Sequence, residues 1–186
     1  MSTTIQSKTT QHLSDMAGAK KHVLEAITSQ LETDSVKETP EASAILSETK
    51  LLLKKHIREL EALSHRYDAE TKAGIKKLFT NVLGNLAGAY NHLRGEGATR
   101  AVRDTYTALN LLSASLLALK TYGLMVSQPD ISKTAYDQLA EICPLVVKFN
   151  KTLPFVVARE TSKELGLPYA SALPEKVRES TQKLWS

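Results

Sequence analysis

Two residues of this chain, His56 and Glu59, combine side chains that could do chemistry at a spacing that brings them together. Residues three apart share a face of an α-helix, so the imidazole and the carboxylate could hold one metal ion or hydrogen-bond each other. A metal site needs three or more converging ligands, and Glu25 or a second subunit could complete one here. The alternative is a histidine that is hydrogen-bonded within a helical bundle, with an exposed glutamate beside it.

A second group of candidates consists of a thiol and three small polar side chains. Cys143 is the only cysteine, which excludes an internal disulfide and is compatible with a reducing compartment. A nucleophilic thiol needs an activating base or positive charge, and no pattern here provides one, so we predict a small buried side chain. Asn110, Ser113 and Ser115 could line a polar pocket or bond back to the preceding helical turn.

Basic residues are scattered along the chain. The net charge is +4, and lysine pairs at 20–21 and 54–55 have acidic residues near them, which indicates solvated helix faces. Only the stretch from Arg94 to Arg103 concentrates positive charge, and we do not expect nucleic acid as a partner. The sequence has no phosphate-binding glycine loop, paired-cysteine metal motif or Ser/His/Asp signature. We therefore predict no catalytic residue, no cofactor and no enzymatic activity.

The bulk composition is that of one globular domain. The chain has 186 residues, 42% of them hydrophobic. The N-terminus has no apolar signal-like region, and the longest uncharged stretch, Thr105 to Leu119, is shorter than the roughly 20 residues of a membrane span. These features predict a cytoplasmic protein that does not enter a membrane.

The N-terminal third predicts a tail and two helices. Residues 1–12 are rich in Ser, Thr and Gln and are predicted to be disordered, with a first helix starting at Ser14 or Asp15. The next helix has the clearest start, with Thr39 as a cap and Pro40 in the first turn. Its predicted buried seam repeats every seven residues and contains Leu46, Thr49, Leu53, His56, Leu60, Leu63 and Tyr67.

Three more helices are expected in the rest of the chain. One follows Thr71 and ends near Gly95, the next spans about Thr99 to Val126, and the last begins after Pro129. Pro144 and Pro154 predict kinks in the last helix or a break near Pro154. The bundle is expected to cover residues 13–166, and residues 167–186 form a C-terminal extension with one short helix after Pro174.

The middle helices have very few acidic side chains. Between Thr71 and Pro129 the only carboxylates are those of Glu96 and Asp104. Di-metal carboxylate bundles need inward-pointing glutamates from nearly every helix. This absence argues against a di-metal enzyme.

The last two helices carry a resemblance to a known family. The expected helix from about Thr99 to Val126 resembles the penultimate helix of a group of bacterial ferritin-like stress proteins, through Arg103-Asp104, Leu109, Leu112 and Tyr122-Gly123-Leu124. The expected last helix resembles the last helix of that family through Leu139 and Leu153, and His56 falls near a histidine of the family's second helix. The resemblance implies a ferritin-like four-helix bundle, often dimeric. The family's metal-type residues are replaced here, by Ser115 and Leu116, by Leu145 and Val146, and near Gly88, so the expected scaffold has apolar packing in place of a metal centre.

The resulting expectation is an all-α protein: a ferritin-like antiparallel four-helix bundle with an additional N-terminal helix and loose termini. Its expected function is non-enzymatic contact with other proteins, with a stress context implied by the resemblance alone. The alternative function is binding of a metal or small ligand by His56 and Glu59. A homodimer or higher oligomer is expected to bury part of the helix from Thr99 to Val126, because Leu111 and Leu117 lie outside the seam that contains Leu109, Leu112, Leu116 and Leu119.

Overall fold

The computed structural model describes residues 3–68 and 97–181 and is helical throughout them, without a strand. The predicted helix between Thr71 and Gly95, with its glycines, lies outside the described residues. The helices are α1 (Thr3–Gln30), α2 (Asp34–Lys37), α3 (Pro40–Asp68), α5 (Ala98–Met125), α6 (Pro129–Glu164) and α7 (Ala172–Thr181). The all-α prediction is confirmed for this part of the chain.

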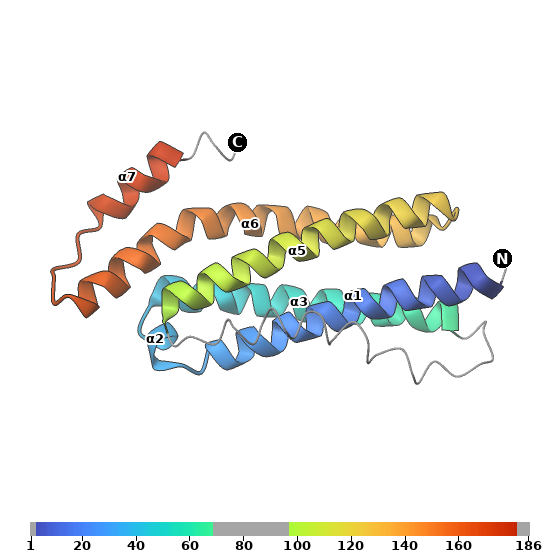
Figure 1. Ribbon diagram of the computed structural model, residues 1–186, viewed down its shortest axis with the longest axis horizontal. Coiled ribbons are helices and arrows are strands. Elements are labelled where there is room, and N and C mark those ends of the chain that lie inside the picture. Colours follow the sequence, from blue (N-terminus) through green and yellow to red (C-terminus); the bar gives the residue numbers. More distant parts are fainter. Residues whose placement is uncertain (1–2, 69–96, 182–186) are drawn as a thin grey trace.

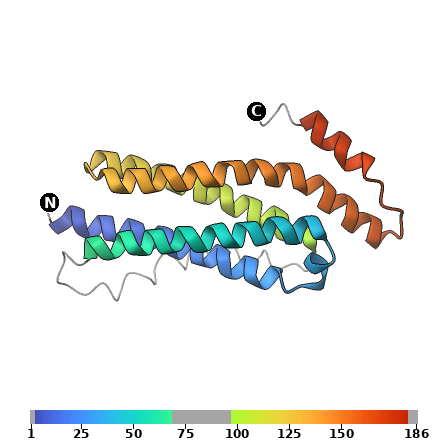
Figure 2. The ribbon, with the colours of Figure 1, turned by 180° about the vertical axis from the view of Figure 1, so that it is seen from behind.

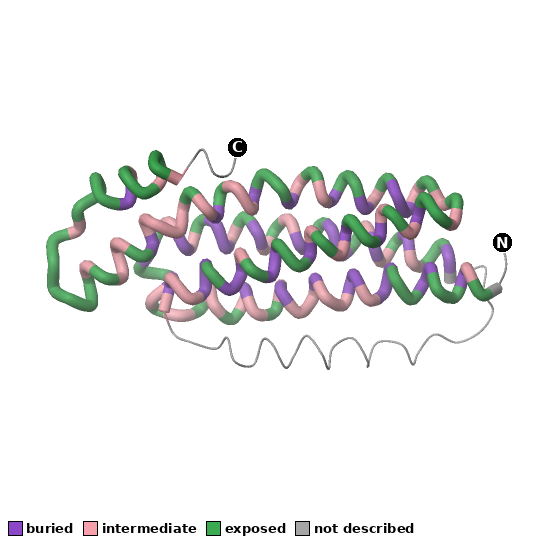
Figure 3. Tube along the Cα trace, turned by 45° about the horizontal axis from the view of Figure 1, so that its top comes forward, coloured by how far each residue is buried: buried purple, intermediate pink, exposed green. Residues whose placement is uncertain are grey.

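Four long helices lie alongside one another, as two antiparallel pairs (Figures 1 and 2). The first pair is α1 with α3 and the second is α5 with α6, and these two pairs make the most extensive contacts between helices. Contacts of α3 with α6 and of α1 with α5 join the pairs, and the buried residues face the inside of this arrangement (Figure 3). The core is therefore shared by all four helices.

The first helix begins earlier than predicted. It starts at Thr3, so the prediction of a disordered tail over residues 1–12 is wrong for the described residues from Thr3 onward. The polar side chains of this turn have distant partners: Gln6 Nε2 donates to the carbonyl of Tyr67 at 3.1 Å, and Thr9 Oγ1 lies 3.0 Å from the hydroxyl of Tyr122. Tertiary contacts thus stabilise a segment whose composition alone does not predict a helix.

The other predicted helices that fall within the described residues are present at the expected places. α3 begins at Pro40, and all seven residues of its predicted seam are buried. Leu109, Leu112, Leu116 and Leu119 of α5 are buried, whereas Leu111 and Leu117 are 48% and 55% exposed. The predicted pattern of α5 is confirmed, including the leucines left outside the seam.

The longest helix, α6, passes through both of its prolines. It continues to Glu164, so the predicted break near Pro154 is not found. Gly166 follows the helix with a φ of +64°, and the amide of Leu167 donates to the carbonyl of Ser162 at 2.8 Å. This glycine-dependent cap ends the helix and starts the connection to α7, which packs on α6.

Candidate functional site: a buried polar cluster between three helices

A lysine occupies the core face of α1. Leu13, Met16, Val23 and Ile27 are buried there, and Lys20 lies between them at the same three- and four-residue spacing. Its side chain has an exposed fraction of 0%. The interpretation of Lys20 as part of a solvated face is therefore wrong, because its position within the helical period points it into the bundle.

His56 is the first partner of this lysine. The Lys20 Nζ atom lies 3.1 Å from His56 Nδ1, and on the other side of the ring His56 Nε2 lies 3.0 Å from an oxygen of Glu141. The consistent arrangement has Nε2–H donating to the carboxylate and Nδ1 accepting from the lysine. The two nitrogens of this buried ring, whose exposed fraction is 0%, are thus both engaged.

Gln138 connects the remaining members of the cluster. Its side-chain oxygen accepts a 2.7 Å hydrogen bond from Lys20 Nζ, and its Nε2 donates to the carbonyl of His56 at 3.1 Å and to Glu59 at 2.9 Å. Glu59 therefore binds Gln138, and the cluster contains both members of the predicted pair. Lys55 lies at the rim and forms a 2.5 Å ion pair with Glu141.

Burial lowers the pKa of the two central groups of the cluster. Two lysines face two glutamates around a neutral histidine. Burial lowers the pKa of Lys20 to about 7, and the carboxylates of Glu59 and Glu141 oppose this in part. Burial also lowers the pKa of His56 to about 4, assisted by the positive charge of Lys20.

In this arrangement the amino group of Lys20 already occupies the position at the imidazole nitrogen that a metal would need. Within the described residues no group of three or more His, Cys, Asp or Glu side chains is placed to hold a metal. Leu116 and Leu145, two of the residues expected to give apolar packing in place of a metal centre, are buried in the core, whereas the centre around His56 is polar. What the cluster can do chemically is exchange a proton at Lys20.

Sequence reasoning missed Lys20, Gln138 and Glu141. Helical spacing could have identified two of them as buried. Lys20 continues the three- and four-residue spacing of the buried residues of α1, and Gln138 has the same spacing from the buried Ala135 and Ile142 of α6. Glu25, suggested as a further ligand, is 76% exposed in side-chain area and pairs with His22.

The other predicted candidates have ordinary environments. The hydroxyls of Ser113 and Ser115 donate to the carbonyls four residues earlier, at 2.8 and 2.9 Å, and the amide of Asn110 does the same at 2.8 Å, which confirms back-bonding. Cys143 is exposed, so the prediction of a buried thiol is wrong. Arg103 donates to the buried carboxylate of Asp104 at 3.0 Å, and Arg94 lies outside the described residues.

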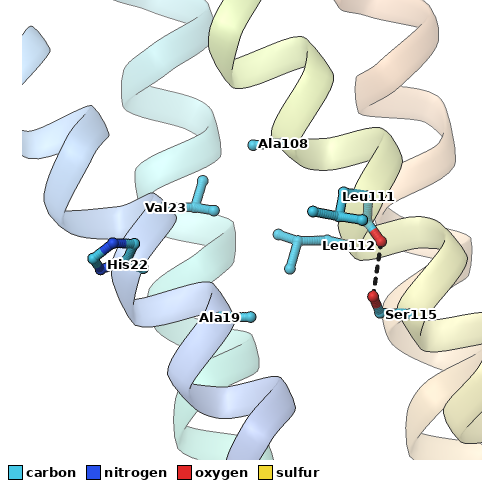
Figure 4. Close-up of a pocket in the computed structure, with 7 residues that line it drawn as sticks. All are labelled: Ala19, His22, Val23, Ala108, Leu111, Leu112 and Ser115. Carbon is cyan, nitrogen blue, oxygen red and sulfur yellow. Dashed lines mark hydrogen bonds between the residues drawn. The ribbon is translucent and has the colours of Figure 1, made fainter. Parts of the chain in front are cut away.

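An apolar crevice lies next to the cluster, between α1 and α5 (Figure 4). Its volume is about 100 Å³, and Ala19, His22 and Val23 form the α1 wall. On the α5 wall are Leu111 and Ser115, whose hydroxyl bonds back to its own helix rather than across the gap. A second cavity of about 270 Å³ adjoins it and shares Ala19 and Ser115, so the gap runs along both helices.

A larger groove lies between α6 and α7. Its volume is about 640 Å³, and its lining includes Leu153, Val157, Leu167, Leu173 and Val177. None of the residues that line this groove belongs to the polar cluster.

Comparison of the chain with protein-family models, curated proteins and solved structures finds no match. Among the described helices α5 is long and apolar enough, by length and composition alone, to cross a membrane, and core helices of soluble proteins meet the same criterion.

Proposed function

We propose that this chain is a non-enzymatic, ferritin-like helical-bundle protein that acts through protein–protein contact and associates with a second copy of itself through α5. One observation carries the proposal: the exposed face of α5 has no charge over four turns. Its exposed residues from Asn110 onward are Asn110, Leu111, Ala114, Leu117, Ala118, Thr121, Leu124 and Met125. Leu124 and Met125 are 63% and 82% exposed.

A solvated helix face normally carries charged side chains, and a contiguous apolar face marks a contact surface. The one charged side chain of α5 in this region, Lys120, is directed over the ring of Tyr136 on α6. A second copy suits such a face because two uncharged surfaces meet about a two-fold axis without like-charge repulsion. α7 packs on α6, so in the described residues it does not cover this face.

The polar cluster supports a non-catalytic role for the bundle centre. Lys20 and His56 are fully buried, and their polar atoms bond to neighbouring side chains, which leaves a substrate no approach to them. The alternative function, a metal held by His56 and Glu59, requires displacement of Lys20. Elemental analysis of protein purified without an affinity tag tests it: a stoichiometric metal that disappears in His56→Ala would favour the alternative.

The association is tested by light scattering and sedimentation over a range of protein concentrations. We expect a dimer for the unmodified chain and a monomer for the double variant Leu117→Glu, Leu124→Glu. The matched control is Leu51→Glu, Leu173→Glu, which adds the same charges at two exposed leucines of α3 and α7 and should stay dimeric. An unmodified chain that is monomeric throughout, or a control that dissociates equally, would refute the proposal.

A further inference from the structure

We propose that Lys20 is a proton-sensitive contact that sets how firmly α1 is held against α3 and α6: binding a proton loosens α1 and releasing it tightens α1. The inference concerns how tightly α1 packs against α3 and α6, and it does not depend on association through α5. It rests on the geometry of the buried amine and on what surrounds it.

The surroundings of the amine fit its neutral form. The described residues give Lys20 Nζ two hydrogen-bond acceptors, Gln138 Oε1 at 2.7 Å and His56 Nδ1 at 3.1 Å. A neutral amine has two N–H donors and an ammonium has three. The neutral form therefore uses all its donors, whereas the charged form buries a third donor together with a positive charge.

The charged groups facing this site come from two helices. α3 contributes Lys55, His56 and Glu59, and α6 contributes Glu141. Both carboxylates are already engaged, Glu59 by Gln138 and Glu141 by His56 and Lys55, and about two-fifths of each side chain is exposed, which lets water screen their attraction for Lys20. α5 carries no charged side chain between Asp104 and Lys120, and on α1 the neighbouring Lys21 pairs with Glu61.

The direction of the pH effect follows from the two states of α1. In the packed state the pKa of Lys20 is about 7, and in an opened state it returns toward 10.5. Between these values the opened state binds more protons, so rising pH favours the packed state. These two pKa values give an upper limit of about 50-fold for the decrease in opening between pH 7 and pH 9. His56, with a pKa of about 4, remains neutral over this interval.

The movement would reach the surface through the residues adjacent to Lys20. Ala19, His22 and Val23 form the α1 wall of the crevice shared with α5 (Figure 4). Lys20 lies between Ala19 and His22 in sequence but points into the bundle, so its protonation state acts on the same helical turn that lines the crevice. Loosening of α1 would widen this gap.

Amide hydrogen exchange measures the opening of α1 directly. Protection of the α1 amides, corrected for the intrinsic pH dependence of exchange, should rise by about tenfold or more from pH 7 to pH 9, within the linkage limit given above. The rise should persist in the matched control Lys21→Met and disappear in Lys20→Met. A rise of the same size in Lys20→Met, or none in the unmodified chain, would overturn the proposal.

A second measurement does not require any variant to fold. Nuclear magnetic resonance of the lysine side chains in the unmodified chain should show one amine that loses its proton between pH 6 and 8, well below the ordinary lysine pKa of about 10.4. If all lysines stay protonated to pH 9.5, Lys20 is not a proton-sensitive contact.

Discussion

His56 shows at the scale of one residue how neighbours decide the behaviour of an ionisable side chain. Its ring is buried, donates through Nε2 to Glu141 and lies against the amine of Lys20. Burial and the charge of Lys20 hold its pKa at about 4, below the ordinary value of 6.5, so the histidine is neutral in the folded protein. Protonation of His56 therefore opposes folding.

We predict that this histidine makes the protein sensitive to acid. Unfolded chains bind a proton at His56 below pH 6.5, so its contribution to stability is lost as the pH falls from 6.5 toward 4, by about 3 kcal/mol at most. Denaturant unfolding measured from pH 7 to pH 4 should show a shallower decline for His56→Gln, which keeps a hydrogen-bonding side chain without this titration. An unchanged decline would assign the acid sensitivity to carboxylates instead.

Helix α5 depends on a residue of another helix for its start. Gly97 precedes it without a side-chain cap of its own, and the carboxylate of Glu160 on α6 accepts hydrogen bonds from the amides of Ala98 and Thr99 at 2.8 and 3.0 Å. Negative charge at a helix N-terminus satisfies otherwise unpaired amides and the helix dipole. A methyl group at Gly97 would lie 2.6 Å from a Glu160 oxygen, so the carboxylate would have to move from its capping position.

These contacts predict that substitutions at Glu160 and Gly97 have non-additive effects on the free energy of unfolding. Glu160→Ala should lower the free energy of unfolding by about 1 kcal/mol through loss of the cap. Gly97→Ala should also destabilise the protein, because its methyl group displaces the same carboxylate, and it should cost less when Glu160 is already alanine. Denaturant unfolding of the four combinations gives the coupling. Additive losses would mean that the two residues act independently.

At the scale of the whole molecule, α6 packs between α3 and α5, and this packing decides which face of α6 is exposed to solvent. Ala135, Ile142, Leu145 and Phe149 point into the core, and Cys143 is exposed on the opposite side. A thiol outside the core can meet reagents without any unfolding.

We predict that Cys143 is labelled by a maleimide in the native protein at nearly the rate of the denatured chain. The control places a cysteine at the fully buried Ala135, in a Cys143→Ser background, where labelling should require opening of the bundle. Protection of Cys143 in the native state would show that α6 is rotated or covered.

Features that depend on local signals could be predicted from the amino-acid sequence. Pro40 in a first turn predicted where α3 begins, and the four-residue and three-residue spacing of leucines predicted the buried stripe of α5. His56 and Glu59, the two residues singled out for chemistry, both belong to the polar cluster, where His56 contacts Lys20 and Glu141, and Glu59 accepts from Gln138. The predictions of helix starts and helix faces succeeded because these features depend on neighbours within a few positions.

The remaining features depend on contacts between residues that are far apart in the sequence. α1 extends back to Thr3 because Gln6 and Thr9 meet residues of α3 and α5, and no local pattern contains those contacts. Lys20 changes from a predicted surface charge to the centre of the cluster because its acceptors, at positions 56 and 138, come from two other helices. Burial of a charged side chain is tolerable only when such partners are assembled around it, and that assembly depends on the packing of the whole bundle.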